Sequence, residues 1–136
     1  MTSVLFLKVE DNQSKVKRIC EAIQSHFSNN ESILVGAPTA EAAKFADMML
    51  WRFAEESFLP HVISEAQTNE RIAITTSQKN VNQASIFLNL CPGSCKNSGD
   101  YKVVYELFDQ TSDEKKGLSE ERLQHYRSLG FNVTIN

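Results

Sequence analysis

Two short, mainly apolar runs, each followed by a helical pattern, constrain the fold more than any other feature of this sequence. The runs cover residues 3–10 and 32–37. Because neither run strictly alternates apolar with polar residues, both are typical of strands that are covered on two faces. Amphipathic segments follow them at 11–30 and 38–51. This order predicts an α/β domain with three layers, in which helices flank a mostly parallel central sheet.

The two helical segments carry start signals and one apolar face each. Asp11, Asn12 or Ser14 can cap the first segment, and Thr39 can cap the second. The apolar face of the first consists of Val16, Ile19, Cys20, Ile23 and Phe27. The apolar face of the second consists of Ala42, Phe45, Ala46, Met49 and Leu50. We expect both faces to pack on the sheet.

Further strands are predicted in the middle of the chain. They cover 61–64, 71–76, 84–90 and 101–109. The polar, turn-prone segment 65–70 favours a hairpin between the first two of them. Residues 91–100, which are rich in Gly, Pro, Ser and Asn, form the clearest loop.

The C-terminal segment predicts a last helix and a last strand. The helix lies within 111–131, with Leu118 or Ser119 near its start and Gly130 just past its end. Residues 132–135 can return to the sheet as an edge strand. No internal repeat or second domain is apparent, so we expect residues 1–136 to form a single domain.

Composition excludes several classes of protein. Apolar residues make up 41% of the chain and charged residues 23%, which is ordinary globular usage. The net charge of −3 provides no overall positive field, so we expect no direct binding of nucleic acid. No apolar run approaches the roughly 20 residues that span a bilayer, which excludes a membrane protein. Three cysteines and the lack of a secretory signal predict a reduced, cytoplasmic protein.

No cofactor or metal site is predicted. Cys91 and Cys95 have a spacing that a metal could use, but Cys20 and the three histidines supply no second close pair of ligands. The segment 34–43 follows a strand and opens a helix, where a phosphate loop would lie. It contains a single glycine and neither of the glycine-rich phosphate-binding motifs. Nucleotide binding is therefore disfavoured.

No catalytic residues stand out. Cys20 lies on an inward helix face, where a thiol is inert, and His26 is six residues away rather than one helical turn. His61 could act as a base, although a lone histidine after a proline more often bonds the backbone. The acidic residues fall on polar helix faces and loops, where solvated charges are the common explanation.

The aromatic residues around the end of the second helix raise a different question. Trp51 follows two core-face residues, so at ~100° per residue it points away from the core. Phe53 and Phe58 lie in a segment that Pro60 prevents from continuing as a helix. Such aromatics either fold under their own domain or contact a partner, and the pattern alone favours neither.

Two motifs identify a resemblance to a known family. Residues 50–61 read "LWRFAEESFLPH" and residues 126–132 read "YRSLGFN". Together they resemble the signatures of the chi subunit of bacterial DNA polymerase III. The strands expected at 84–90 and 103–109 follow the order of that family, so the resemblance covers essentially the whole chain.

The resemblance implies a nucleotide-binding-like topology without a nucleotide site, and a protein with no cofactor and no catalytic activity. It further implies a non-enzymatic accessory subunit of the bacterial replicative DNA polymerase III holoenzyme. In this family, chi binds the psi subunit of the clamp loader on one surface. Another surface binds the acidic C-terminal tail of single-stranded DNA-binding protein during DNA replication.

Site residues follow from the same motifs. The positions that match the psi-binding surface are Trp51, Phe58 and Pro60. The positions that belong to the tail-binding surface are Gln124, Tyr126, Arg127 and Phe131.

The last helix departs from the family at two positions. Glu120 and Gln124 stand where the best-known members have basic residues. Each lost charge-assisted contact weakens the binding of an acidic tail by roughly 1.5–3 kcal/mol. The residues that could compensate for this loss are Lys115, Lys116, Arg122 and Arg127.

Three alternatives to this interpretation remain. The first is a small α/β enzyme that uses His61 or a cysteine in a cleft beside the second helix, and it requires a pocket and a perturbed pKa. The second is an orphan protein-interaction module. The third is binding of single-stranded DNA by stacking of its bases on the aromatics. The two negative charges of Glu55 and Glu56, against the single positive charge of Arg52, oppose this binding.

Overall fold

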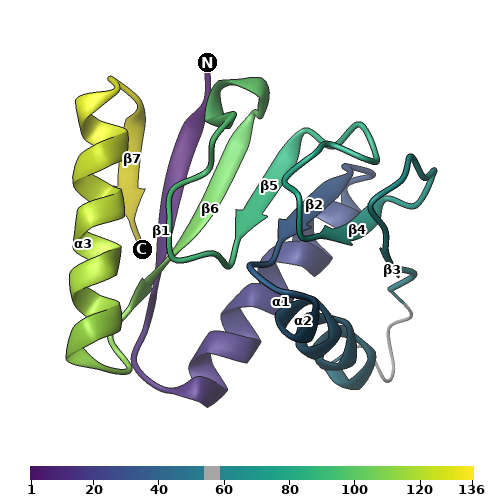
Figure 1. The fold of residues 1–136 in the computed structure, drawn as a ribbon, viewed down its shortest axis with the longest axis horizontal. Helices are drawn as coiled ribbons and strands as arrows, with labels where there is room; N and C mark the ends of the chain where they lie inside the picture. Colours follow the sequence, from purple (N-terminus) through teal and green to yellow (C-terminus); the bar gives the residue numbers. More distant parts are fainter. Residues whose placement is uncertain (54–58) are drawn as a thin grey trace.

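The structure is a computed structural model, and it describes residues 1–53 and 59–136 (Figure 1). The strands in these residues are β1 (Ser3–Val9), β2 (Ile33–Gly36), β3 (Val62–Ile63), β4 (Ile72–Thr75), β5 (Ile86–Asn89), β6 (Val103–Asp109) and β7 (Asn132–Ile135). The helices are α1 (Asn12–Ser28), α2 (Ala40–Phe53), α3 (Asp113–Ser128) and a short 3-10 helix, η1 (Ser98–Asp100).

The strands form one sheet in the order β3-β4-β2-β5-β6-β1-β7. Every strand pair in the described residues is parallel, which confirms the expected α/β class. β1 and β6 pair along seven residues, and β5 is the central strand of the sheet. β7 pairs with β1 and ends the sheet, so the predicted C-terminal edge strand is confirmed.

The hairpin expected between β3 and β4 is wrong. The two strands are parallel, with Val62 opposite Ala73. The carboxylate of Glu65, just after β3, accepts hydrogen bonds from the Thr75 hydroxyl at 2.5 Å and the Thr76 backbone N–H at 2.9 Å. Because these bonds join the carboxyl ends of both strands, the intervening chain must run back along the sheet before β4 begins.

The helix starts agree with the expected caps at α1 and α2 but not at α3. Asp11 and Ser14 form a reciprocal capping box at α1, and the Thr39 hydroxyl accepts a hydrogen bond from the Ala42 N–H at α2. α3 begins five or six residues earlier than expected. Ser112 caps it by accepting a hydrogen bond from the Lys115 N–H, and two acidic residues in the first turn favour that start.

The end of α3 matches the prediction at Gly130, which has a φ of +85°. The Gly130 N–H donates to the Arg127 carbonyl, and the Phe131 N–H donates to the Tyr126 carbonyl. This is the hydrogen-bond pattern of a Schellman motif. The Tyr126 and Phe131 rings meet edge to face, 6.3 Å apart, as the apolar contact that accompanies such a turn.

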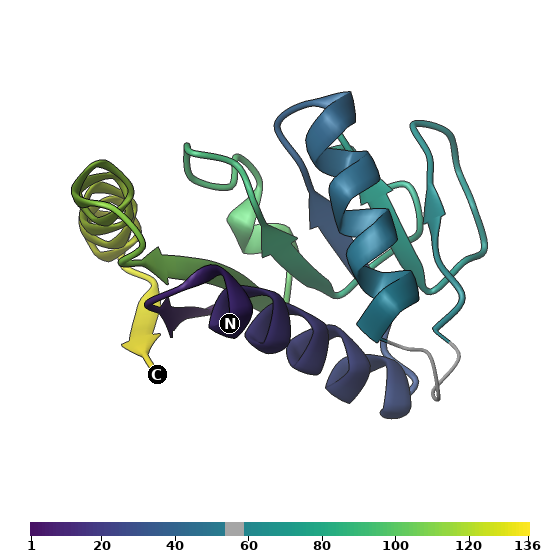
Figure 2. The ribbon, with the colours of Figure 1, turned by 90° about the horizontal axis from the view of Figure 1, so that it is seen from below.

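Two apolar clusters on the two faces of the sheet establish the three layers. α1 and α2 contribute to one cluster, and α3 contributes to the other. Figure 2 shows α3 beside β7, at the other end of the sheet from α2. Within the described residues, no helix is both long and apolar enough to cross a membrane.

One expected core residue is misplaced by the sequence pattern. Phe45 was assigned to the core face of α2, yet 63% of it is exposed, and that assignment is wrong. The residues of α2 that are buried are Ala43, Ala46, Met49 and Leu50. Ala46 lies near the middle of this buried face. Phe45 is about 100° from Ala46 around the helix, and it therefore lies at the edge of the apolar stripe.

Candidate functional site

Trp51 lies in the last turn of α2 and is 50% exposed. One side of its indole packs on the His61 ring, with 4.6 Å between the ring centroids. The expectation that Trp51 points away from the core agrees with this position. Its exposed half leaves aromatic area at the surface, and Pro60, directly before His61, is half-buried.

His61 fixes the chain beneath Trp51. Its side chain is fully buried, and its Nδ1 lies 2.7 Å from the Leu59 carbonyl oxygen. Nε2 lies 3.0 Å from a carboxylate oxygen of Asp47 on α2. Since both ring nitrogens are engaged and the ring is buried, His61 is placed to hold the indole rather than to act on a substrate.

The same stretch contains two further aromatic residues, Phe53 and Phe58. Phe53, which the sequence left unassigned, is 37% exposed at the end of α2. Phe58 lies outside the described residues.

The C-terminal motif divides between surface and core. Gln124 and Arg127 are exposed on α3, and Phe131 is half-buried after it. Tyr126, in contrast, is fully buried. It therefore lies beneath the expected tail-binding surface and can contribute to that surface only by positioning its neighbours.

Arg122 is not available as a compensating cation. It is 8% exposed, and its Nε donates to the carboxylate of Glu106 at 3.0 Å. Its other nitrogens donate to the carbonyls of Pro92 and Leu107. The expectation that Arg122 supplies charge to the surface is thus wrong. Lys115 and Lys116 are exposed on α3. Glu120, whose negative charge counteracts theirs, is exposed on the same helix.

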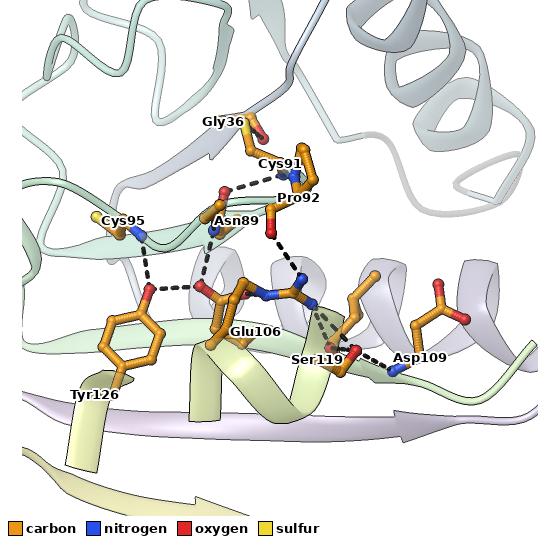
Figure 3. Close-up of polar contacts among 12 residues, drawn as sticks. Gly36, Asn89, Cys91, Pro92, Cys95, Glu106, Asp109, Ser119 and Tyr126 are labelled. Carbon is orange, nitrogen blue, oxygen red and sulfur yellow. Dashed lines mark hydrogen bonds and ion pairs between the residues drawn. The ribbon is translucent and has the colours of Figure 1, made fainter. Parts of the chain in front are cut away.

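Glu106 is the centre of a buried polar network that the sequence analysis missed (Figure 3). It lies in the middle of β6 and is 1% exposed. Besides Arg122, its carboxylate accepts hydrogen bonds from the Tyr126 hydroxyl at 2.5 Å and the Asn89 side-chain amide at 2.8 Å. One signal was available in the sequence, because a period of two places Glu106 on the same face of the strand as the buried residues Val104 and Phe108.

The network also ties down the loop after β5. Tyr126 accepts a hydrogen bond from the Cys95 N–H, and Asn89 donates to the Gly93 carbonyl (Figure 3). Asn89 further accepts from the Cys91 N–H. Side chains that converge on one carboxylate therefore join this loop, β6 and α3 into a single unit.

Burial raises the pKa of Glu106 to about 7, although Arg122, Tyr126 and Asn89 all favour the charged form. Burial, together with the carboxylate beside it, raises the pKa of Tyr126 as well. The Tyr126 hydroxyl is therefore neutral and acts as a hydrogen-bond donor to Glu106.

A cleft of about 670 Å³ opens at the carboxyl ends of β2, β5 and β6, where sheets of this kind often bind ligands. Pro38 lines the turn between β2 and α2 and has no backbone N–H to offer a phosphate. Lys15 of α1 and Asp109 of β6 pair at 3.0 Å on its wall. Although burial opposes it, hydrogen bonds from Thr111 and Lys15 hold the pKa of Asp109 below its usual value.

The cysteines of the enzyme alternative are poor nucleophiles in this structure. Cys91 lines the cleft, and burial raises its pKa. Burial raises the pKa of Cys20 to about 12 and that of Cys95 to about 11. All three are free thiols that are protonated at neutral pH. Across residues 1–53 and 59–136, no three His, Cys, Asp or Glu side chains gather as a metal site would require.

Comparisons with known proteins give a family and a fold. The family model described as "DNA polymerase III chi subunit, HolC" matches residues 1–134 of the 136. No curated protein matches the chain. Among solved structures, the chain is similar to the crystal structure of T4 UvsW, with a TM-score of 0.59 and 13% identity. That match covers 99% of this chain but only 40% of the other, and at such identity it shows the fold alone.

Proposed function

The chain belongs to the DNA polymerase III chi subunit family, and from this membership we propose that it is a non-enzymatic accessory subunit of the replicase. In this proposal, one surface binds a psi-like subunit of the clamp loader. A second surface binds the acidic C-terminal tail of single-stranded DNA-binding protein. The protein then links the clamp loader to coated single-stranded DNA without contacting the nucleic acid itself.

The observation that carries the proposal is the half-exposed indole of Trp51, which packs on the buried ring of His61. The ring is held by α2 on one side and by the buried His61 on the other. A large aromatic side chain that is already fixed loses little entropy when a partner covers it. Pro60, directly before His61, constrains the backbone beside the same ring. These features support a protein-binding surface at this place.

The tail-binding half is supported by fewer charges. Arg127 is exposed in the last turn of α3, and Lys116 is exposed nearer the start of the helix. Glu120 lies between them along the helix and repels an acidic tail. We therefore propose that Arg127 is the main cation of this surface.

The enzyme alternative gains no support from the site. Both nitrogens of His61 are engaged, and the cleft contains Cys91 rather than a base–nucleophile pair. The raised pKa of Cys91 keeps its thiol in the unreactive form. These observations support a subunit that acts by binding.

Replacing Trp51 tests the proposed psi-binding surface. We expect Trp51→Ala to weaken binding of the purified psi-like subunit at least thirtyfold, because truncating an interface hot spot typically costs 2 kcal/mol or more. Trp51→Phe, which keeps an aromatic ring, should retain part of the affinity. Isothermal titration calorimetry measures both, and circular dichroism confirms that the variants are folded.

Leu129→Ala is the matched control, since Leu129 is an exposed apolar residue at the C-cap of α3, away from α2. It should bind like the unmodified protein. The proposed surface is wrong if Trp51→Ala also binds like the unmodified protein.

A further inference from the structure

The apolar surface of α2 extends well beyond Trp51. Phe45 is 63% exposed and Met48 is 48% exposed, and both lie on the solvent side of the same helix. We call Phe45, Met48 and Trp51 the α2 ridge. Monomeric domains seldom leave three large apolar side chains together at the surface unless the surface binds something.

The spacing of the α2 ridge is regular. Its members are three residues apart, so at 1.5 Å per residue they span about 9 Å along the helix axis. Rows of side chains spaced by three residues are one of the two ridge types that fit the grooves of a neighbouring helix. The geometry is thus complementary to a helix lying along α2.

The ridge also continues into the cleft. Phe45 lines the cleft at the start of α2, together with the apolar side chains of Val16, Leu90 and Leu118. A partner that covers Trp51 and runs towards the start of α2 therefore reaches an apolar hollow beyond Phe45.

Basic residues flank the α2 ridge. Lys44 and Arg52 are exposed and lie within about 60° of Met48 around the helix, on its two sides. Glu41 is the acidic residue of the first turn. Between Lys44 and Arg52 the acidic residue is Asp47, whose carboxylate lies 3.0 Å from His61 Nε2, so the exposed charges beside Met48 are the two cations.

We propose that the α2 ridge binds an amphipathic helix of the psi-like partner, with acidic residues beside its apolar stripe. This inference rests on the proposed function, because it assigns to the same partner a site that continues from Trp51 along α2. The apolar stripe of the partner packs against Phe45 and Met48, and its acidic residues pair with Lys44 and Arg52. Where the partner helix passes Phe45, one of its apolar side chains lies at the mouth of the cleft.

The test uses the double variant Phe45→Gln with Met48→Gln. Both positions are exposed and glutamine is a good helix former, so the fold should be retained. We expect the purified psi-like subunit to bind this variant roughly 10- to 100-fold more weakly. Leu129→Gln makes the same kind of change to an exposed apolar residue outside α2 and should leave the affinity unchanged.

A charge reversal tests the chemistry of the partner. Arg52→Glu should slow association severalfold and make the remaining binding less sensitive to salt, because it removes a cation beside the ridge. If Arg52→Glu leaves the association rate unchanged at low salt, the proposal that the partner helix carries acidic residues beside its apolar stripe is wrong.

The outcomes separate this inference from the proposed function. If Trp51→Ala abolishes binding but the double variant binds normally, the psi-like surface stands and its extension along α2 is wrong. If neither change affects binding, both are wrong. Sedimentation of the protein alone should show a monomer. A dimer that the double variant dissociates would mean that a second copy, and not the partner, covers the ridge.

Discussion

At the scale of single residues, the most consequential side chain is Glu106. A buried carboxylate is costly unless its lone pairs are satisfied, and here three donors from two other elements satisfy it. Removing one donor would leave the charge incompletely paired. The network therefore specifies one position for α3 relative to β6, and with it the position of Arg127.

The raised pKa of Glu106 predicts a pH dependence of stability. Its pKa is 4.5 when unperturbed and about 7 in the fold, so the native state binds this proton more tightly than the unfolded chain does. The contribution of Glu106 is thus largest below pH 4.5, falls as the pH rises to about 7, and is constant above it. The fall amounts to about 3 kcal/mol.

Glu106→Gln removes that titration. We expect the difference in unfolding free energy between the protein and this variant to change by about 3 kcal/mol between pH 4.5 and 7, as measured by urea denaturation. Glu120→Gln, which removes an exposed carboxylate, is the control. Parallel stability curves for the protein and Glu106→Gln would contradict the raised pKa.

Sequence patterns located some residues well and others poorly. Cys20 and Met49 are buried as predicted, because they lie near the middle of their apolar stripes. Phe45 lies at the edge of its stripe, where a small rotation of the helix decides between burial and exposure. Tyr126 belongs to a recognisable motif, but only the tertiary position of Glu106 shows that its hydroxyl points inward.

At the scale of elements, capping side chains and acidic residues in the first turn determine where the helices begin. Ser112 and the acidic residues after it start α3, while Gly117 has open space around its Cα and does not interrupt the helix. The parallel direction of β3 and β4 is accompanied by contacts of Glu65, which bonds residues ten and eleven positions later. A contact at that separation leaves no periodic trace in the sequence.

β2 ends at a glycine because of a neighbouring strand. A Cβ on Gly36 would lie 2.5 Å from Cζ of Phe87, whose ring is fully buried. We expect Gly36→Ala to lower the free energy of unfolding by about 1–3 kcal/mol through overpacking, as measured by urea denaturation. Gly93→Ala meets no atom within 4 Å and is the matched control. Equal effects of the two substitutions would contradict this account.

At the scale of the whole molecule, the two proposed binding surfaces lie at opposite ends of the sheet. α3 lies beside β7, whereas α2 lies near β2, β3 and β4 (Figure 1). The sheet between them is continuous, with parallel pairing throughout the described residues. Trp51 and Arg127 both lie outside the cleft that Phe45 of α2 and Leu118 of α3 share, so we expect two partners to occupy the protein together, as a linking subunit requires.

This arrangement predicts independent binding. Saturation with the psi-like subunit should leave the affinity for a short acidic tail peptide unchanged, as measured by fluorescence anisotropy. Arg127→Ala should weaken the peptide roughly 10- to 100-fold and leave the psi-like subunit bound, because it removes a charge-assisted contact. Lys17→Ala removes an exposed cation from α1 and is the control. Displacement of either partner by the other would contradict the arrangement.

The sequence by itself determined the α/β class, the order of the main elements, the caps of α1 and α2, and the two motifs of the family. These depend on interactions within a few residues, or on a hydrophobic period that a single element records. Only the tertiary structure decided the parallel pairing of β3, the burial of Arg122 and Tyr126 around Glu106, and the exposure of Phe45. Each of these depends on residues distant along the chain, which meet only when the sheet has formed and its helices have packed.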